Sequence, residues 1–311
     1  MKRRDFLKYS AVGAASLSVL GLPFNTEAAS KTIKLTILHT NDQHSRIDPF
    51  PSDGRKYAGM GGMARRASLV ERVRKEEQNV LLLDSGDIWQ GTPYFNFFNG
   101  ELEYKLMNEM QYDAATLGNH DFDLGLEGLQ KQLPVANFEF LIANYDFSGT
   151  ILKDKFKPYK VFEKEGVRIG VFGLGIEMEG LISKNLYGET VYLDPVQKAK
   201  EMVQELRNNQ KCHLIVCLSH LGYSYTTDKV DDRKLAAQVS GIDVILGGHT
   251  HTFMEKPEVL RHESGHETLI HQVGWAGIYL GRIDFEFNKK TKQRTSVKTA
   301  ALPVDNPVLT S

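Results

Sequence analysis

The fold that we predict for this chain depends on the stretch Leu117-Gly118-Asn119-His120-Asp121-Phe122-Asp123-Leu124-Gly125. It follows Asp113-Ala114-Ala115-Thr116, a short run that predicts a buried strand. The Asn-His pair should therefore leave the carboxyl end of that strand. Ligands bind at such ends in α/β sheets, because loops converge there while the sheet beneath them stays rigid. The stretch thus predicts a site at one edge of a sheet.

Three side chains on this turn can bind ligands or move protons. Asn119 offers a neutral carbonyl oxygen, His120 an imidazole, and Asp123 a carboxylate that can hold the imidazole in one tautomer. The alternative is a polar turn in which Asn and Asp cap a helix that begins near Gly125. The other strand ends of the chain decide between these interpretations.

Four further predicted strands end in side chains of the same chemical kind. They are followed by Asp42 and His44 after residues 33–38, by Asp87 after 80–83, by His220 after 214–218, and by His249 and His251 after 242–246. A spacing of two puts both side chains of a pair on one side of an extended segment. Five of the ten histidines lie just past apolar strands, whereas random placement would scatter them. The pattern favours a metal site over solvated strand ends.

The rest of the chain gives weaker signals. Apolar spacing predicts a helix from Met63 to Glu77, and the aromatic residues between 89 and 98 are interpreted as core. We expect His262, His266 and His271 to be non-catalytic, and residues 297–311 to form a weakly patterned tail.

Composition excludes several classes of protein. The 311 residues are 41% hydrophobic, enough to bury one large core or two modest ones. The formal net charge is -1, with acidic and basic residues interspersed, so electrostatic capture of a nucleic acid polymer is not expected. Ala11 to Leu22 is too short to span a bilayer, and we predict no stable membrane span.

Residues 1–29 have the pattern of a cleavable export signal. A basic start containing Arg3-Arg4 precedes the apolar run, and small residues follow before Ser30. The paired arginines resemble a twin-arginine signal, and the alternative is an ordinary secretory signal. Either route predicts a mature protein, residues 30–311, that works in the periplasm or outside the cell.

The five strand ends occur in an order that resembles the calcineurin-like metallophosphoesterases. The phrases Leu38-His39-Thr40-Asn41-Asp42, Gly118-Asn119-His120-Asp121-Phe122-Asp123 and Gly247-Gly248-His249-Thr250-His251 resemble their 5′-nucleotidase and UDP-sugar hydrolase branch. The similarity covers nearly the whole predicted mature chain. It implies an α/β, four-layer αββα sandwich in which two packed mixed sheets are flanked by helices.

The resemblance also implies a role for each site residue. One divalent metal ion would be held by Asp42, His44, Asp87 and His251, and a second by Asp87, Asn119, His220 and His249. Zinc, manganese or iron suits such mixed ligands. A water that bridges the metals would attack phosphorus in line. Asn119 and His120 would contact the substrate, His120 would stabilise or protonate the leaving oxygen, and Asp123 would orient His120. His251 departs from several members of the branch, which place an amide there.

We therefore expect a phosphoesterase that acts on nucleotides or other phosphate esters. The alternatives are a 2′,3′-cyclic nucleotide phosphodiesterase and a thiosulfohydrolase that cleaves a sulfur ester with the same metals. A non-enzymatic metal-holding module is disfavoured, because the metals do not need His120 and Asp123. Extracellular nucleotidases that the chain resembles carry a second domain that binds the nucleoside base. We expect that domain to be absent here, and a separate polypeptide could supply it.

Overall fold

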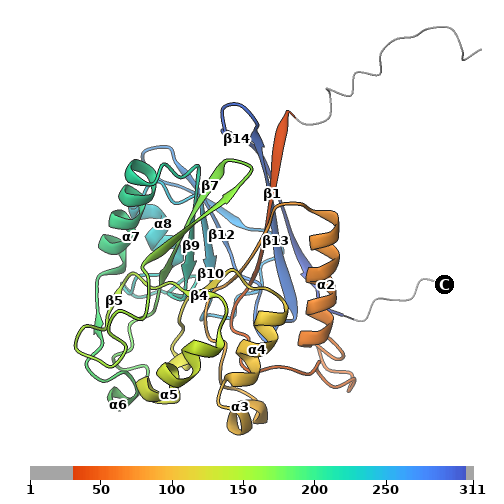
Figure 1. The fold of residues 1–311 in the computed structure, drawn as a ribbon, viewed down its shortest axis with the longest axis vertical. Helices are drawn as coiled ribbons and strands as arrows, with labels where there is room; N and C mark the ends of the chain where they lie inside the picture. Colours follow the sequence, from red (N-terminus) through yellow and green to blue (C-terminus); the bar gives the residue numbers. More distant parts are fainter. Residues whose placement is uncertain (1–30, 306–311) are drawn as a thin grey trace, which may run out of the picture.

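The structure of the protein is a computed structural model, of which residues 31–305 are described. Its two large sheets pack face to face, with helices on both outer sides (Figure 1). This is the predicted four-layer arrangement, and the fold prediction is confirmed. The export signal predicted for residues 1–29 lies outside the described residues.

The first sheet has the strand order β14-β13-β1-β2-β3-β4. Its parallel part consists of β1 (Thr32–Thr40), β2 (Val80–Asp84), β3 (Ala114–Ala115) and β4 (Glu139–Phe140). Its antiparallel edge consists of β13 (Tyr279–Asn288) and β14 (Arg294–Pro303). The carboxyl ends of β1, β2 and β3 consequently lie at one edge of this sheet.

The second sheet has the strand order β11-β12-β10-β9-β7-β6. Its parallel strands are β7 (Val167–Leu174), β9 (Leu214–Ser219), β10 (Val244–Gly247) and β12 (Glu267–His271). β6 (Tyr159–Lys164) and β11 (Glu258–Arg261) pair antiparallel at its two edges. A small separate sheet joins β5 (Tyr145–Asp146) to β8 (Val191–Tyr192).

Helices cover the outer faces of both sheets. The first sheet is covered by α2 (Met63–Glu76), α4 (Glu101–Glu109) and α5 (Gly125–Gln132), and the second by α7 (Pro195–Gln204) and α8 (Asp232–Gln238). The short helices are α3 (Pro93–Phe98), η2 (His120–Phe122), η3 (Leu133–Val135), α6 (Lys184–Tyr187) and the π-helix η4 (Glu205–Asn209). At the start of α7, Asp194 accepts the backbone N–H of Val196 at 2.8 Å, as its position before Pro195 predicts.

Burial on both faces explains why the central strands are continuous apolar runs. In β2, Leu81 and Leu83 enter the core between the sheets, while Val80 and Leu82 pack under the helices. In β9, Val216 likewise faces the other sheet. Each fully buried aliphatic side chain of this size contributes about 1.5–3 kcal/mol, so the sheets form a rigid base for the loops at their edge.

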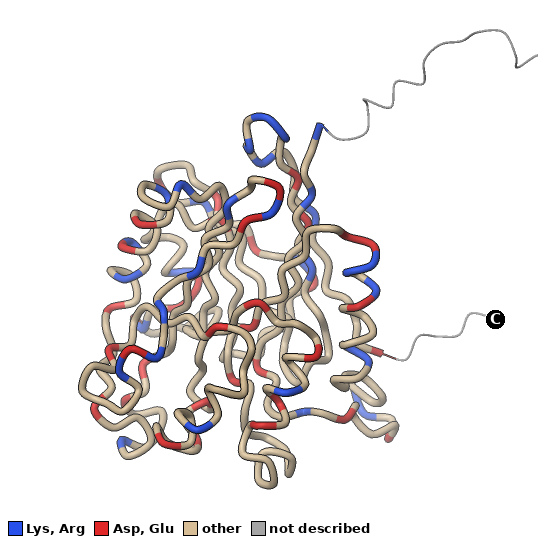
Figure 2. The backbone as a smooth tube through the Cα atoms, viewed as in Figure 1, with Lys and Arg blue, Asp and Glu red and all other residues tan. Residues whose placement is uncertain are grey.

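Charged residues of both signs lie along outer elements such as α2 and α7 (Figure 2). None of the helices within residues 31–305 is long and apolar enough to cross a membrane.

Two expectations from the sequence are wrong. Much of the tail predicted after residue 297 belongs to β14, a ten-residue strand that pairs only with β13. Its pattern is weak because an edge strand with exposed side chains needs no regular apolar face. Among the aromatic residues assigned to the core, Trp89 and Phe95 are buried, but Phe97 is 78% exposed.

Candidate metal centre

The carboxyl ends of five strands from both sheets bring the predicted site residues to one place. The walls of a hollow of about 360 Å³ include His44, Asp87, Asn119, His120, His249 and His251. Asp42 and His220 are fully buried beside them, and Asp123 lies behind His120. The structure thus assembles every residue that the sequence singled out for this site.

Asp42, His44 and His251 form a first group of potential metal ligands. Their ligand atoms all lie within 4.8 Å of one another. The Nε2 atoms of His44 and His251 are 2.9 Å apart, and His251 Nε2 lies 3.3 Å from Asp42 Oδ1. The side chains come from the loops after β1 and β10, so the group joins the two sheets.

Asp87, His220 and His249 form a second group with the same limit of 4.8 Å between ligand atoms. His220 Nε2 lies 3.2 Å from Asp87 Oδ2, and His249 Nδ1 lies 2.9 Å from Asn119 Oδ1. Asp87 Oδ2 is also 3.8 Å from His44 Nε2. Asp87 therefore lies between the two groups.

The charged side chains of the second group shift one another's pKa values. Burial alone would raise the pKa of Asp87, but the imidazoles of His220 and His44 lower it below its ordinary value. Burial opposes protonation of His220, yet the Asp87 carboxylate outweighs it and raises the pKa of His220 to about 10. Burial and the neighbouring His220 lower the pKa of His249 to about 4. In this group the Asp87 carboxylate therefore ionises readily, and the His249 imidazole stays neutral at neutral pH.

The predicted contact between His120 and Asp123 is present. His120 Nδ1 lies 2.9 Å from Asp123 Oδ2, and this hydrogen bond raises the pKa of His120 against the opposing effect of burial. The backbone N–H of His120 donates to Asp87 Oδ1 at 2.8 Å. The His120 turn is thus fixed to the carboxylate that lies between the two groups.

The loops that carry the ligands have an uncommon backbone. Asp42, His44, Asp87, His249 and His251 have φ angles of 49°, 49°, 56°, 70° and 50°. Such left-handed conformations cost non-glycine residues about 1–3 kcal/mol each and persist where surrounding contacts fix them. Gly118 permits a close approach to this site, because a Cβ there would lie 2.2 Å from Asp87 Oδ1.

Sequence reasoning missed Asp121, which holds two of these loops together. Its buried carboxylate accepts the backbone N–H groups of Asp87, Ile88 and Gly118 at 2.8–3.0 Å. Burial and the charge of Asp87 raise the pKa of Asp121 to about 7. The available signal was a second carboxylate in the same turn as His120.

Asp84 has a structural role beneath the site. Its carboxylate accepts the hydroxyl of Thr40 at 2.6 Å and the backbone N–H of Gly86 at 2.9 Å. Burial raises the pKa of Asp84 to about 7. The residue orients the ends of β1 and β2 beneath the hollow.

The residues present fit a pair of divalent cations. Each group combines imidazole with carboxylate, a donor set suited to zinc, manganese or iron. His220 Nε2 is fully buried and has no hydrogen-bond partner among the described residues. Because a buried nitrogen without a hydrogen bond is costly, the position of Nε2 beside the Asp87 carboxylate, 3.2 Å away, favours a ligand role.

Comparisons with known proteins agree with this geometry. A family model described as calcineurin-like phosphoesterase matches residues 35–253. The chain belongs to the calcineurin-like phosphoesterase family. The family and the two groups of side chains together suggest a dinuclear metal site.

Relatives within the family include 5′-nucleotidases. The chain is 34% identical to a snake venom 5′-nucleotidase of Crotalus adamanteus, over 84% of this chain and 47% of the relative. It is 35% identical to a 5′-nucleotidase of Vibrio cholerae, over 92% and 55%. The structure of a 5′-nucleotidase precursor from Thermus thermophilus superposes with a TM-score of 0.79 at 35% identity, over 87% of this chain and 54% of that one. The chain spans about half the length of these relatives.

Proposed function

We propose that this calcineurin-like phosphoesterase hydrolyses phosphate esters of nucleotides at a dinuclear metal centre. The observation that carries the proposal is the convergence of both ligand groups and the His120–Asp123 pair on one hollow. The 5′-nucleotidases among its relatives support nucleotides as the substrate class.

We assign the ligands as the resemblance implied. Asp42, His44, Asp87 and His251 would hold one ion, and Asp87, Asn119, His220 and His249 the other. A pair of bound divalent ions would neutralise phosphoryl charge and lower the pKa of an attacking water.

The chain's own residues would bind the ester and move a proton. Asn119 and His120 line the hollow, where they can contact the phosphoryl oxygens. Asp123 holds Nδ1 of His120, which leaves Nε2 to donate a proton to the departing oxygen. The raised pKa of His120 favours the protonated form that this step requires.

The test is phosphate release by residues 30–311, loaded with manganese or zinc, from nucleotides, UDP-sugars and aryl phosphates. We expect hydrolysis of nucleotides, and we expect the His120→Ala variant to lose about 10²–10⁴-fold in kcat while retaining both metals. Release of sulfate from a sulfur ester, without phosphate release, would identify the thiosulfohydrolase instead. Failure of metal-loaded protein to cleave any phosphate ester would contradict the proposal.

We also propose that the protein is exported with residues 1–29 as its signal. The basic start, apolar run and small residues support this proposal. Fractionation of cells that make the full chain should find residues 30–311 outside the cytoplasm, and replacing Arg3 and Arg4 by lysines should retain the protein inside if the twin-arginine route is used.

A further inference from the structure

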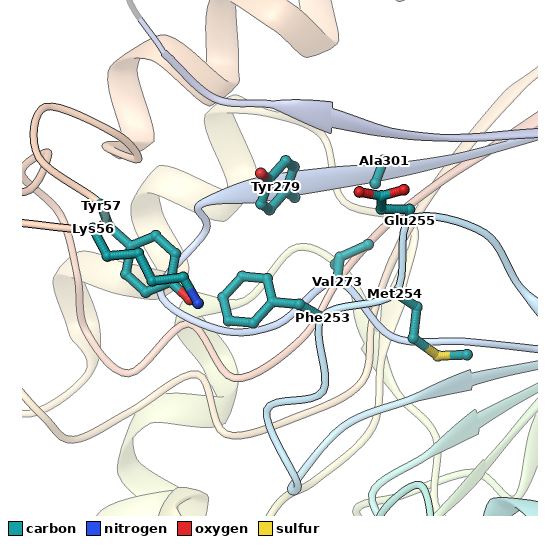
Figure 3. A pocket seen from close by; sticks show the side chains of 8 residues that line it. All are labelled: Lys56, Tyr57, Phe253, Met254, Glu255, Val273, Tyr279 and Ala301. Carbon is teal, nitrogen blue, oxygen red and sulfur yellow. The ribbon is translucent and has the colours of Figure 1, made fainter.

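The segment after β12, residues 272–276, lies against the loop that carries His249 and His251. Sequence reasoning gave this segment no role. The backbone N–H of Gly274 donates to the carbonyl of Thr252 at 3.0 Å, and Phe253 and Val273 form a β-bridge. Both line a hollow beside the segment (Figure 3). The loop therefore runs alongside residues 272–274 instead of extending freely into solvent.

Gln272 makes the most contacts with this loop. Its side chain is fully buried, and its Nε2 donates to the carbonyl of Gly248 at 2.8 Å. Its Oε1 accepts the backbone N–H of Thr252 at 3.0 Å and the hydroxyl of Thr250 at 3.2 Å. One amide thus holds the loop on both sides of His249 and His251.

The same segment also contacts Asp42, another ligand of the first group, and His251 itself. The N–H of Ala276 donates to the carbonyl of Asp42 at 2.7 Å. The side chain of Asn41 donates to the carbonyl of Gly274 at 2.6 Å. The ring of Trp275 stacks on His251, with centroids 5.7 Å apart and an interplanar angle of 9°. Residues 272–276 therefore hold both Asp42 and His251 in place.

Gln272 is also connected toward His220. Its Nε2 lies 3.4 Å from Asp232 Oδ2, and Asp232 Oδ1 accepts the hydroxyl of Ser219 at 2.5 Å. Ser219 directly precedes His220 at the end of β9. The network Ser219–Asp232–Gln272 thus lies behind three histidines of the site, and none of its three residues lines the hollow.

The backbone of the loop explains why such support is needed. His249 and His251 both have positive φ angles, a conformation that non-glycine residues avoid when free. A Cβ at Gly247 would lie 2.8 Å from Gln272 Nε2 and 2.2 Å from Asp232 Oδ2, so the chain approaches the network as closely as glycine allows. Fixed ligands bind a metal more tightly, because less conformational freedom is lost on binding.

We propose that Gln272 is a positioning residue of the metal centre, which holds His249 and His251 in the geometry that binds both ions. The inference rests on the proposed metal centre but not on the identity of the substrate. Loss of the amide releases one histidine from each ligand group, so it weakens binding of both ions. Loss of an outer partner of a metal ligand typically costs about 10–100-fold in metal affinity.

The experiment measures metal binding without turnover. Chelator-treated wild type, Gln272→Leu and Gln272→Glu are titrated with Mn²⁺ or Zn²⁺ by calorimetry, and thermal unfolding of the metal-free proteins is recorded in parallel. The matched control is Thr268→Val. Thr268, on β12, is fully buried like Gln272, but its hydroxyl donates to the carbonyl of Ile242 and not to the loop that carries His249 and His251. Gln272→Glu keeps the shape of the side chain and loses the donor to Gly248.

We expect both Gln272 variants to bind the metals about 10–100-fold more weakly, while Thr268→Val loses stability but keeps the wild-type affinity. Wild-type affinity in a folded Gln272 variant would overturn the inference, as would an equal loss of affinity in Thr268→Val. If Gln272→Leu does not fold, Gln272→Glu decides. Wild type that binds no metal would instead refute the proposed metal centre itself.

Discussion

Two histidine pairs in this protein have nearly the same geometry and different surroundings. His44 and His251 have ring nitrogens 2.9 Å apart, centroids 4.9 Å apart and an interplanar angle of 67°. For His39 and His271 the corresponding values are 2.9 Å, 4.9 Å and 68°. The first pair faces the hollow with Asp42 and Asp87 within 4 Å of His44. The second pair is fully buried.

The difference shows that paired imidazoles alone do not make a metal site. Burial lowers the pKa of His39, and His271 lowers it further, so this pair is held neutral. His271 Nε2 also pairs with the carbonyl of Met254 at 3.1 Å. The first pair has carboxylates beside it and faces the hollow, so it can bind a metal ion. The second pair has neither, and it forms a structural contact between β1 and β12.

The largest expected effect on metal affinity comes from removing the charge of Asp42, the carboxylate beside His44 and His251. Asp42→Asn keeps the shape of the side chain but removes the charge that lies 3.3 Å from His251 Nε2. We expect metal affinity to fall by more than about 100-fold, beyond the loss of an outer-shell partner. Calorimetric titration checks this. Asp113→Asn, which removes an acid on the amino side of β3, is the control, and equal losses in both variants would contradict the comparison.

The buried pair should make stability depend on pH. Burial lowers the pKa of His271 to about 4, whereas the unfolded chain titrates near 6.5. The unfolded state therefore binds protons first as the pH falls, and stability is lost between these values, by about 3 kcal/mol for His271. Urea unfolding of metal-free protein at pH 8, 6 and 4.5 measures it. His271→Gln should flatten the profile, and an unchanged pH dependence in that variant would refute the assignment.

A histidine outside both pairs sharpens the comparison, because His120 has an acid partner but no place in either ligand group. Asp123→Asn removes the charge that orients His120 and favours its protonated form. We expect kcat to fall about 10–100-fold and metal binding to stay unchanged. Steady-state kinetics and metal titration separate the two effects. A loss of metal from this variant would place Asp123 in the metal centre instead of beside it.

Much of the architecture could be predicted because doubly covered strands leave a strong signal. Val80–Leu83 and Leu214–Leu218 are apolar on both faces, so their limits and the polar residues after them can be recognised directly. β14 could not be recognised, since none of its side chains is buried and its backbone pairing with β13 defines it.

The site was predictable only as a set of strand ends. Which histidine meets which carboxylate depends on contacts between distant segments, such as His44 with His251, 207 positions apart. His39 lies five residues before His44, yet β1 directs it to a buried partner without acids. The role of Gln272 depends on the path of the loop at residues 248–252, which residue types alone do not specify.

The most direct test of the account is the number of metal ions that the chain binds at equilibrium. Chelator-treated residues 30–311 and the Asp87→Ala variant are titrated with Mn²⁺ or Zn²⁺, and bound metal is quantified by elemental analysis. Because Asp87 lies between the two ligand groups, we predict a pair of ions in wild type and weakened binding of both in the variant. Wild type that binds fewer ions, or a variant that binds both with wild-type affinity, would contradict the account.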